Sequence, residues 1–176
     1  MPRAGETIAN PATGETLTWV VTAADSGGSL LRVDVVMEPG RPGPPVHVHR
    51  AFPEHHDVKA GRLAIELDGQ ERVLEAGATI DIPRGAQHTF RVVGDEQVRT
   101  VVDYAPPGRY EDFIDRLYAL AREGKTDDKG APRNILQTAV VARAHLDEFA
   151  LAKPPFAVQK ALFVLLAPIG RLAGFR

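Results

Sequence analysis

Residues 43–49 read Gly43-Pro44-Pro45-Val46-His47-Val48-His49, and Glu54 and Gly61 follow them. A second stretch begins at Gly77 and continues as Pro83-Arg84-Gly85-Ala86-Gln87-His88. Together they supply three histidines and one glutamate, set among glycines and prolines that punctuate short strands. Imidazole nitrogen and carboxylate oxygen suit Fe, Mn, Co, Ni, Cu and Zn. The two stretches therefore predict a site for one divalent transition metal ion inside a β-barrel.

The sequence around these stretches is typical of a β-protein from about residue 5 to residue 104. Short runs rich in β-branched or aromatic residues recur at Thr16–Val21, Leu30–Met37, Arg62–Leu67, Thr79–Ile82, His88–Val93 and Gln97–Tyr104. Turn signals separate them, and Asp68-Gly69 predicts a tight hairpin because glycine permits a positive φ. Many short, closely spaced strands indicate a sandwich, a barrel or a jelly roll.

Alternation along these strands assigns side chains to faces, because neighbouring residues of a strand point to opposite sides. His47 and His49 should project together, and His88 should share a face with the apolar Phe90. By the same parity Glu54 and His56 point inward, while His55 points outward to solvent. Trp19, Phe90 and Tyr104 are predicted to pack in the barrel, where one of them could line a cavity. The walls of that cavity are expected to be Val58, Leu63, Ile65, Ile82, Phe90 and Val92.

The pattern becomes helical after the breaker Pro106-Pro107-Gly108. A first helix should carry Phe113, Leu117 and Leu120 on one stripe, and a second is predicted from Ile135 to Phe149, with His145 at a surface or interface. A third should follow Pro154-Pro155, with an apolar stripe at Leu162, Leu165, Leu166, Ile169 and Leu172. We interpret it as a helix docked on the barrel or on a partner subunit. An amphipathic helix resting on a membrane surface is the alternative.

Composition excludes several classes of function. The 176 residues carry 21 basic and 23 acidic side chains, a formal charge of −2, and no basic cluster that would recruit nucleic acid. The chain has no cysteine, which rules out disulfides, thiolate metal sites and a cysteine nucleophile. Its longest apolar run in the last helix, Ala161–Ala167, is far too short to span a membrane. Without an apolar signal core in the first residues, a cytoplasmic protein is expected.

The two metal-ligand stretches resemble the two motifs of the cupin family in its small, single-domain form. The first motif is matched by His47-x-His49, four residues, Glu54, six residues and Gly61. The second is matched by Gly77, five residues, Pro83-x-Gly85, two residues and His88. Val92 stands where the second motif has an asparagine, and His56 stands where such sequences usually carry a large apolar residue. The segment Asn10-Pro11-Ala12-Thr13-Gly14-Glu15 and the helical tail are similar to those of bacterial quercetinase-like cupins.

This resemblance implies a cupin jelly-roll barrel, a double-stranded β-helix, over residues 1–105. The α-helical extension, residues 106–176, is then not an independent domain. By the same resemblance His47, His49, Glu54 and His88 would hold the metal ion. Glu54 and His56 would be the catalytic residues, Glu54 as proton acceptor and His56 by orienting Glu54 or holding substrate. A homodimer is also expected, because barrels of this kind expose strand edges that need covering.

Three functions agree with these observations. The first is a metal-dependent dioxygenase resembling quercetinase, acting on a small aromatic molecule with a hydroxyl group. The second is another reaction on the same metal, such as isomerisation, decarboxylation or hydrolysis. The third is a barrel that binds or senses a small molecule without turning it over, since one fold hosts many functions.

Overall fold

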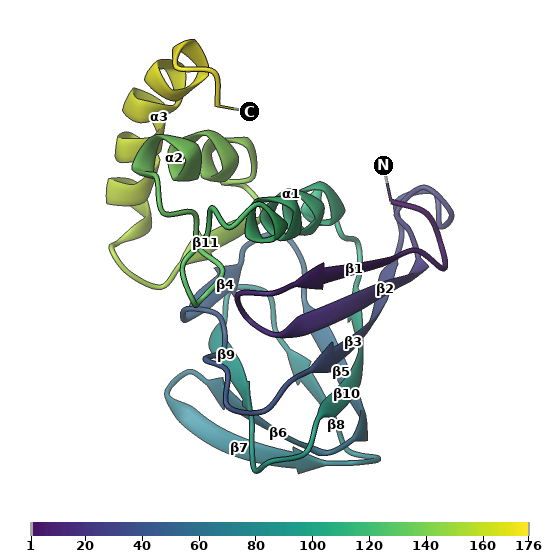
Figure 1. Ribbon diagram of the computed structural model, residues 1–176. Coiled ribbons are helices and arrows are strands. Elements are labelled where there is room, and N and C mark those ends of the chain that lie inside the picture. Colours follow the sequence, from purple (N-terminus) through teal and green to yellow (C-terminus); the bar gives the residue numbers. More distant parts are fainter. Residues whose placement is uncertain (1, 176) are drawn as a thin grey trace.

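Two antiparallel sheets face each other in this computed structural model, which describes residues 2–175. The first sheet has six strands in the order β1-β2-β3-β10-β5-β8, and the second has five in the order β11-β4-β9-β6-β7 (Figure 1). In chain order the strands are β1 (Thr7–Asn10), β2 (Glu15–Val21), β3 (Leu31–Met37), β4 (His47–His49), β5 (Glu54–Ala60), β6 (Arg62–Leu67), β7 (Gln70–Glu75), β8 (Thr79–Ile82), β9 (Gln87–Val92), β10 (Val98–Tyr104) and β11 (Phe149–Leu151). This is the jelly-roll arrangement that the sequence predicts.

The space between the sheets is the hydrophobic core. Along β3 every second residue from Leu31 to Met37 is buried, and the residues between them lie on the outer face. Residues from both sheets meet inside, among them the fully buried Trp19 of β2 and Ile65 of β6, and Phe52 joins them from the loop between β4 and β5. Apolar side chains removed from water in this way contribute about 25 cal/mol per Å² to folding. The alternation that assigned faces from the sequence is therefore the one that builds the core.

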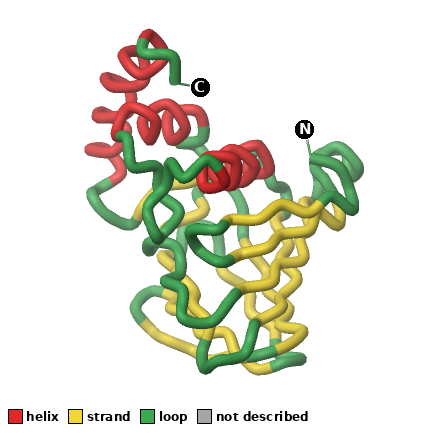
Figure 2. Tube along the Cα trace, in the orientation of Figure 1, coloured by secondary structure: helices red, strands yellow, loops and turns green. Residues whose placement is uncertain are grey.

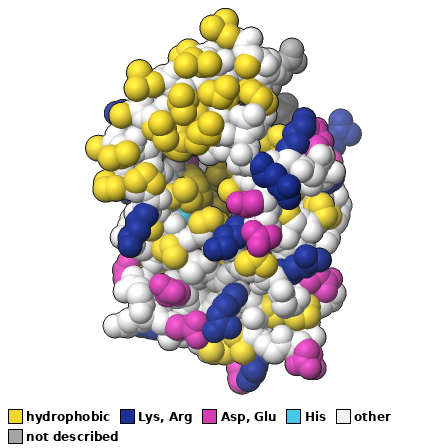
Figure 3. Space-filling model, turned by 60° about the vertical axis from the view of Figure 1, so that its left-hand side comes forward, with side chains coloured by type: hydrophobic (Ala, Val, Ile, Leu, Met, Phe, Trp, Pro, Cys, Tyr) yellow, Lys and Arg dark blue, Asp and Glu magenta, His cyan; other side chains and the backbone are white. Residues whose placement is uncertain are grey.

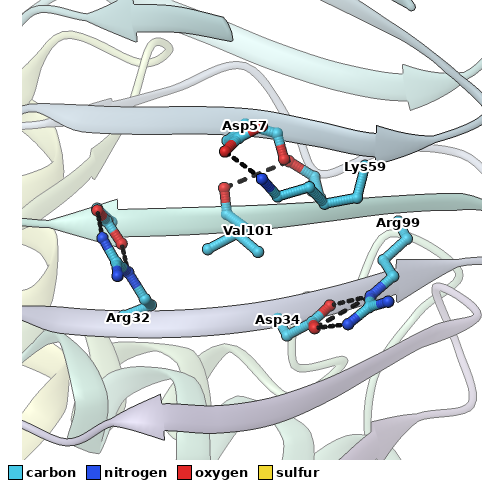
Figure 4. A network of polar contacts seen from close by, with 8 residues as sticks. Arg32, Asp34, Asp57, Lys59, Arg99 and Val101 are labelled. Carbon is cyan, nitrogen blue, oxygen red and sulfur yellow. Dashed lines mark hydrogen bonds and ion pairs between the residues drawn. The ribbon is translucent and has the colours of Figure 1, made fainter. Parts of the chain in front are cut away.

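The outer face of the six-stranded sheet carries ion pairs between neighbouring strands (Figure 4). The Arg32 guanidinium on β3 donates two hydrogen bonds of 2.7 Å to the Asp103 carboxylate on β10. Arg99 on β10 pairs in the same way with Asp34 on β3. Such exposed pairs contribute roughly 0–1 kcal/mol each, so they mark the solvent side of the sheet more than they stabilise it.

The predicted hairpin at Asp68-Gly69 is present. Leu67 on β6 pairs with Gln70 on β7, which leaves two residues in the turn. Asp68 has a φ of 48° and Gly69 a φ of 81°. Two successive positive values suit the right-handed twist of the flanking strands, and glycine adopts them without strain.

Three helices gather at one end of the barrel (Figure 2). They are α1 (Tyr110–Arg122), α2 (Ile135–Ala144) and α3 (Phe156–Leu172). The Asn134 side chain caps α2 by accepting from the backbone amides of Leu136 and Gln137, while α3 begins directly after Pro155. Among the described residues, no helix combines the length and the apolar character needed to cross a membrane. The α-helical extension predicted from the sequence is thus present.

The second predicted helix is shorter than expected and is followed by a strand. It ends at Ala144, whereas the periodicity suggested helix as far as Phe149. Phe149–Leu151 instead forms β11, which pairs with the edge of β4. The sequence of this three-residue apolar run is compatible with a helix or a strand. It forms a strand because the edge of β4 needs hydrogen-bond partners.

His145 differs from its predicted place at a surface or interface. It caps the C-terminus of α2 and is 1% exposed. Its ring lies against Phe113 at 5.3 Å, and its two nitrogens lie within 3.4 Å of Asp112 and Glu148 carboxylate oxygens. The helical period could not reveal this, because residue 145 lies beyond the last helical turn and its surroundings come from α1.

Candidate metal centre

Two paired strands of the five-stranded sheet and one strand of the six-stranded sheet bring the four predicted ligands together. His47 and His49 lie on β4, Glu54 begins β5 and His88 lies on β9. His47 and His88 are direct partners across the β4–β9 ladder, with ring centroids 4.2 Å apart. All four residues are buried, and each offers a ligand atom within 4.8 Å of the others. This His₃Glu group can hold a metal ion.

Backbone carbonyls fix the orientation of two of the imidazoles. The Nδ1 of His47 lies 2.9 Å from the carbonyl oxygen of Pro45, and that of His88 lies 3.1 Å from the carbonyl oxygen of Ala86. A carbonyl oxygen only accepts, so both Nδ1 atoms carry the proton and donate. Nε2 of each ring is then available as a ligand. Metal-binding histidines are commonly held in this way.

His49 provides a second sign that the group fits a cation. Neither of its ring nitrogens makes a hydrogen bond within residues 2–175, although the ring is buried. Its Nε2 lies 3.0 Å from Oε2 of Glu54 without the geometry of a hydrogen bond. A buried nitrogen without a partner is costly. A metal ion bound by Nε2 would remove that cost.

Glu54 divides its two oxygens between two sets of partners. Oε2 faces the ligand histidines and lies 2.9 Å from Nε2 of His88. Oε1 lies 2.9 Å from Nε2 of His56 and accepts a hydrogen bond of 3.2 Å from the hydroxyl of Tyr104. One carboxylate therefore joins the potential metal ligands to His56 and Tyr104.

The electrostatic environment favours the protonation states in which most of these side chains bind metal ions. Burial raises the pKa of Glu54, but the positive character of His56 and His49 and the hydrogen bond with His56 outweigh it and hold the pKa well below its ordinary value. Burial, reinforced by neighbouring histidines, lowers the pKa of His47 well below its usual range. Burial also lowers the pKa of His49, against the attraction of Glu54. An ionised carboxylate and neutral imidazoles are the states that bind metals.

His88 is the exception. Burial lowers its pKa, but the hydrogen bond and charge of Glu54 oppose that effect more strongly, so the pKa is raised. A proton on Nε2 of His88 and a metal ion would compete for the same position beside Glu54. Metal binding here should therefore release protons.

A cavity of about 200 Å³ adjoins the centre. His47, Glu54 and His56 reach its surface, and most of the remaining lining is apolar or aromatic. Most of the residues predicted from the sequence to line the cavity do not line it. Phe90 borders the cavity as expected, whereas Val58, Leu63, Ile65 and Ile82 lie in the barrel core and Val92 packs against that core.

Much of the cavity wall comes from the helical end of the chain. Tyr110 and Phe113 of α1, Val141 of α2, Phe149 of β11 and Phe163 of α3 all border it. Sequence reasoning missed the role of these residues, because none lies in a strand whose parity points to the metal. Tyr104, one of the aromatic residues expected to pack in the barrel or line a cavity, borders the cavity and is the direct partner of Glu54 in the β10–β5 ladder.

The remaining histidine predictions are confirmed. His56 points inward on β5 beside Glu54. His55 points outward, and its Nδ1 lies 2.6 Å from the Asp81 carboxylate at the surface.

Comparison with known proteins agrees with this geometry. Residues 33–103 match the family model described as the cupin domain. The barrel is a cupin domain. A Streptomyces cyaneus protein named polyketide synthase CurC is 40% identical over 68 residues, which are 38% of this chain. The chain spans 44% of the length of that relative.

Solved structures share the cupin fold at lower identity. One is an RmlC-like cupin from Shewanella frigidimarina, with a TM-score of 0.51 and 23% identity over 62% of this chain and 88% of that one. Another is the polyketide cyclase RemF from Streptomyces resistomycificus, with a TM-score of 0.50 and 22% identity over 60% of this chain and 80% of that one. At these identities the likeness concerns the fold alone.

Proposed function

We propose that this cupin is a metal-dependent oxidoreductase, a dioxygenase that acts on an apolar aromatic substrate bearing a hydroxyl group. One observation carries the proposal: four metal-ligand atoms lie within 4.8 Å of one another beside an aromatic cavity that His47 and Glu54 reach. A divalent transition metal held by His47, His49, Glu54 and His88 would supply Lewis acidity and open positions for substrate oxygen.

The residues around Glu54 suit proton removal from a hydroxyl group. The Glu54 side chain reaches the cavity, and its Oε1 atom faces His56 and Tyr104. In the proposed reaction Glu54 accepts the substrate proton, while His56 and Tyr104 hold its carboxylate in place. Nδ1 of His56 has no hydrogen-bond partner among the described residues, so it is available to a polar group of the substrate.

The lining of the cavity supports an aromatic substrate. Phe90, Tyr110, Phe113 and Phe149 offer ring faces and edges, which favour flat aromatic ligands. Polar groups of the lining are few, and those of His47, Glu54 and His56 belong to the centre itself. A substrate held here would place its hydroxyl group at the centre and its apolar rings against the walls.

Cyclisation of a polyketide-like substrate is the second candidate. It is favoured by the relative that is 40% identical and is named a polyketide synthase. Such a reaction needs proton transfer by the same Glu54 and His56, and it consumes no O₂. A barrel that only binds its ligand remains the third outcome of the experiment below.

The first experiment measures metal by elemental mass spectrometry in protein prepared without a histidine tag. The wild type should hold about one equivalent of a transition metal, and His88→Ala should lose it. His55→Ala is the matched control, because His55 lies on β5 but points to the surface, and it should keep the metal. Absence of metal after reconstitution of the wild type would contradict the proposed site.

The second experiment follows substrate loss and O₂ uptake together, using hydroxylated flavonoids and polyphenols as probes. Equal consumption of substrate and O₂, with both oxygen atoms in the product, supports the dioxygenase. Substrate loss that continues under argon supports cyclisation or another rearrangement instead. Binding without any turnover would leave the third function.

His56→Gln separates catalysis from metal binding. It should retain the metal, because His56 contacts Oε1 of Glu54 and lies outside the His₃Glu group. Turnover should fall by about 100-fold, the lower range for loss of acid–base assistance. Unchanged turnover in this variant would exclude a role for His56 in the reaction.

A further inference from the structure

The cavity beside the metal centre has a second polar end. Its first end is formed by His47, Glu54 and His56, and Glu15 borders the same cavity from the start of β2. Figure 3 shows a hollow edged by hydrophobic side chains between the helical end of the molecule and the barrel, the two parts that line this cavity. The proposed reaction uses the first end and leaves the carboxylate of Glu15 without a role.

The two oxygens of Glu15 have different surroundings. Oε2 accepts hydrogen bonds from the hydroxyl groups of Thr13, at 2.8 Å, and Tyr118, at 3.0 Å. Oε1 has no hydrogen-bond or ion-pair partner within residues 2–175, and it is not among the fully buried atoms that lack one. One oxygen therefore fixes the carboxylate in place, and the other is accessible to a ligand.

The turn between β1 and β2 holds Glu15 in position. The Asn10 side chain accepts hydrogen bonds from the backbone amides of Ala12, at 3.1 Å, and Thr13, at 3.3 Å. Gly14 adopts a φ of 72°, and its amide donates to the carbonyl oxygen of Asn10. Asn10 and Thr13 are buried and border the cavity, so the turn is an ordered part of the cavity wall. It presents one carboxylate at a defined place, as a binding site requires.

Helix α1 joins the two polar ends of the cavity. The ring of Tyr110, at the start of the helix, lies 4.8 Å from that of Tyr104, whose hydroxyl donates to Glu54. Near the other end of the helix, Tyr118 holds the carboxylate of Glu15. The two helical tyrosines are eight residues apart in the sequence, which is about 12 Å along a helix. A ligand that contacts both ends must therefore be elongated.

The wall between the two ends is mainly apolar. Ile114 and Leu117, which lie between Tyr110 and Tyr118 on α1, border the cavity, and so does Leu17 of β2. Such a wall packs against apolar rings and offers few hydrogen bonds, so the polar groups at the ends orient the ligand. An elongated aromatic molecule with a polar group at each end matches this arrangement.

A hydroxyl group is the chemical group that fits Oε1 of Glu15. An ionised carboxylate accepts a hydrogen bond there, whereas a protonated one donates from Oε1, because Oε2 already accepts from two hydroxyl groups. A hydroxyl group of the ligand can donate or accept, so it pairs with Oε1 in either state. A carboxylate or phosphate group of the ligand would meet a like charge when Glu15 is ionised. The second end of the cavity therefore favours hydroxyl groups over anions.

We infer that Glu15 is a specificity-determining residue, which binds a second hydroxyl group of the substrate at the end of the cavity away from the metal centre. This role rests on the proposed function, in which the first hydroxyl group lies beside Glu54. It narrows the substrate class to elongated aromatic molecules that carry a hydroxyl group at each end. Thr13 and Tyr118 are positioning residues, because they hold the carboxylate and leave Oε1 to the ligand.

Binding of two matched probes tests this role without turnover. Titration calorimetry under argon compares a biphenyl that has a para hydroxyl group on each ring with the biphenyl that has only one. The wild type should bind the diol at least about tenfold more tightly, because a hydrogen bond to a charged group is added. Glu15→Leu should abolish this preference. Glu6→Leu is the matched control, because Glu6 is exposed and does not border the cavity, and it should keep the preference.

Glu15→Gln provides a second variant with a smaller structural change. Its amide oxygen can still accept hydrogen bonds from Thr13 and Tyr118, so the turn and α1 keep their connection. The preference for the diol should fall by several-fold, since a hydrogen bond to a neutral amide is weaker than one to a carboxylate. Circular dichroism of each variant checks that the fold is retained.

Equal affinity of the wild type for the two probes would overturn the role of Glu15, and so would a preference that persists in folded Glu15→Leu. A wild type that binds neither probe would contradict the proposed aromatic substrate and this role with it. Failure of the proposed reaction alone has a different signature: metal or turnover is missing in the experiments above, while the preference for the diol remains.

Discussion

The barrel interior and helix α3 depart from ordinary residue sorting in opposite directions. In the barrel His47, Glu54 and His88 are buried, although such side chains are usually exposed. On α3 most of the predicted apolar stripe is exposed, although such side chains are usually buried. The exposed side chains, which form the outer stripe of this helix, are Val158, Leu162, Leu165, Ile169 and Leu172. The first departure is compensated within the chain, because each polar group has partners or a place for a cation. The second is not compensated by anything in residues 2–175.

The two regions should respond to different kinds of change. Substituting one residue of the buried His₃Glu group should disturb the whole group, because the remaining polar side chains lose their partners. Substitutions on the exposed apolar stripe of α3 should leave the stability of the isolated chain almost unchanged. Their effect should appear only when a binding partner is present.

Removing ligands should abolish the stabilisation that metal provides. Added metal at 100 times its dissociation constant should stabilise the wild type by about 2.7 kcal/mol, since only the folded chain presents the complete site. His47→Ala/His49→Ala should show no metal-dependent rise in Tm by differential scanning calorimetry, and His55→Ala should behave as the wild type. An equal rise in all three proteins would place the binding elsewhere.

Within α3, the two faces should differ in their contribution to stability. Phe163→Ala removes a buried ring between α3 and the cavity and should cost about 3 kcal/mol of unfolding free energy. Leu165→Ala on the outer stripe should change it by less than about 0.5 kcal/mol. Urea denaturation measures both values. A large cost at Leu165 would show that the outer stripe is covered in solution.

A glycine in the loop before β4 should tolerate a larger side chain less well than a glycine between two helices. A Cβ at Gly43 would lie 1.6 Å from the carbonyl oxygen of Phe90 on β9, so Gly43→Ala should destabilise by roughly 2 kcal/mol. Gly170→Ala should cost less, because its closest approaches, 2.7 Å to a methyl carbon of Val140 and 2.8 Å to the carbonyl oxygen of Leu136, are much longer than 1.6 Å. Urea denaturation midpoints measure the loss of stability in both variants. A larger loss for Gly170→Ala would mean that the loop before β4 adjusts to the added methyl group more easily than the α2–α3 helix pair does.

Glu15 should give the smallest effect, visible as a dependence on pH. Its carboxylate, beside the cavity, accepts hydrogen bonds from Thr13 and Tyr118. Burial raises its pKa more than these bonds lower it. The folded chain therefore binds the proton more tightly than the unfolded chain, and stability declines as pH rises through the folded pKa.

Glu15→Gln cannot titrate, so this part of the decline should be absent. The difference in Tm between variant and wild type should grow as pH increases from below 4.5, the ordinary value for glutamate. Thermal scans across a pH series measure it. A difference that is constant with pH would exclude Glu15 as the titrating group.

The sequence predicted the strands of the barrel well because strand patterning is local. The resemblance to the cupin motifs predicted that His47, His49, Glu54 and His88 lie together, as they do. Side chains of a strand alternate, so His47 and His49 necessarily share a face. The same parity correctly placed His56 inward and His55 outward. The turn at Asp68-Gly69 was equally local, since two positive φ values specify it.

The parts that were predicted less well depend on contacts between distant segments. Phe149 belongs to a strand because the edge of β4, about 100 residues earlier, needed a partner. His145 is buried because α1 packs over it. In both cases the local sequence permitted a helix or a surface, and a neighbour from elsewhere in the chain decided between them.

The sequence by itself thus determined a region of many short strands and the faces of those strands, because period-two alternation and turn chemistry act over a few residues. The resemblance to the cupin motifs added the jelly roll and the grouping of the four His₃Glu residues. Only the tertiary structure decided which residues form the cavity wall and which face of α3 remains in water. A helix rich in apolar residues on several sides has no intrinsic inner face. Close packing at Gly170 against α2 selected one face and left Leu165 and Leu172 exposed.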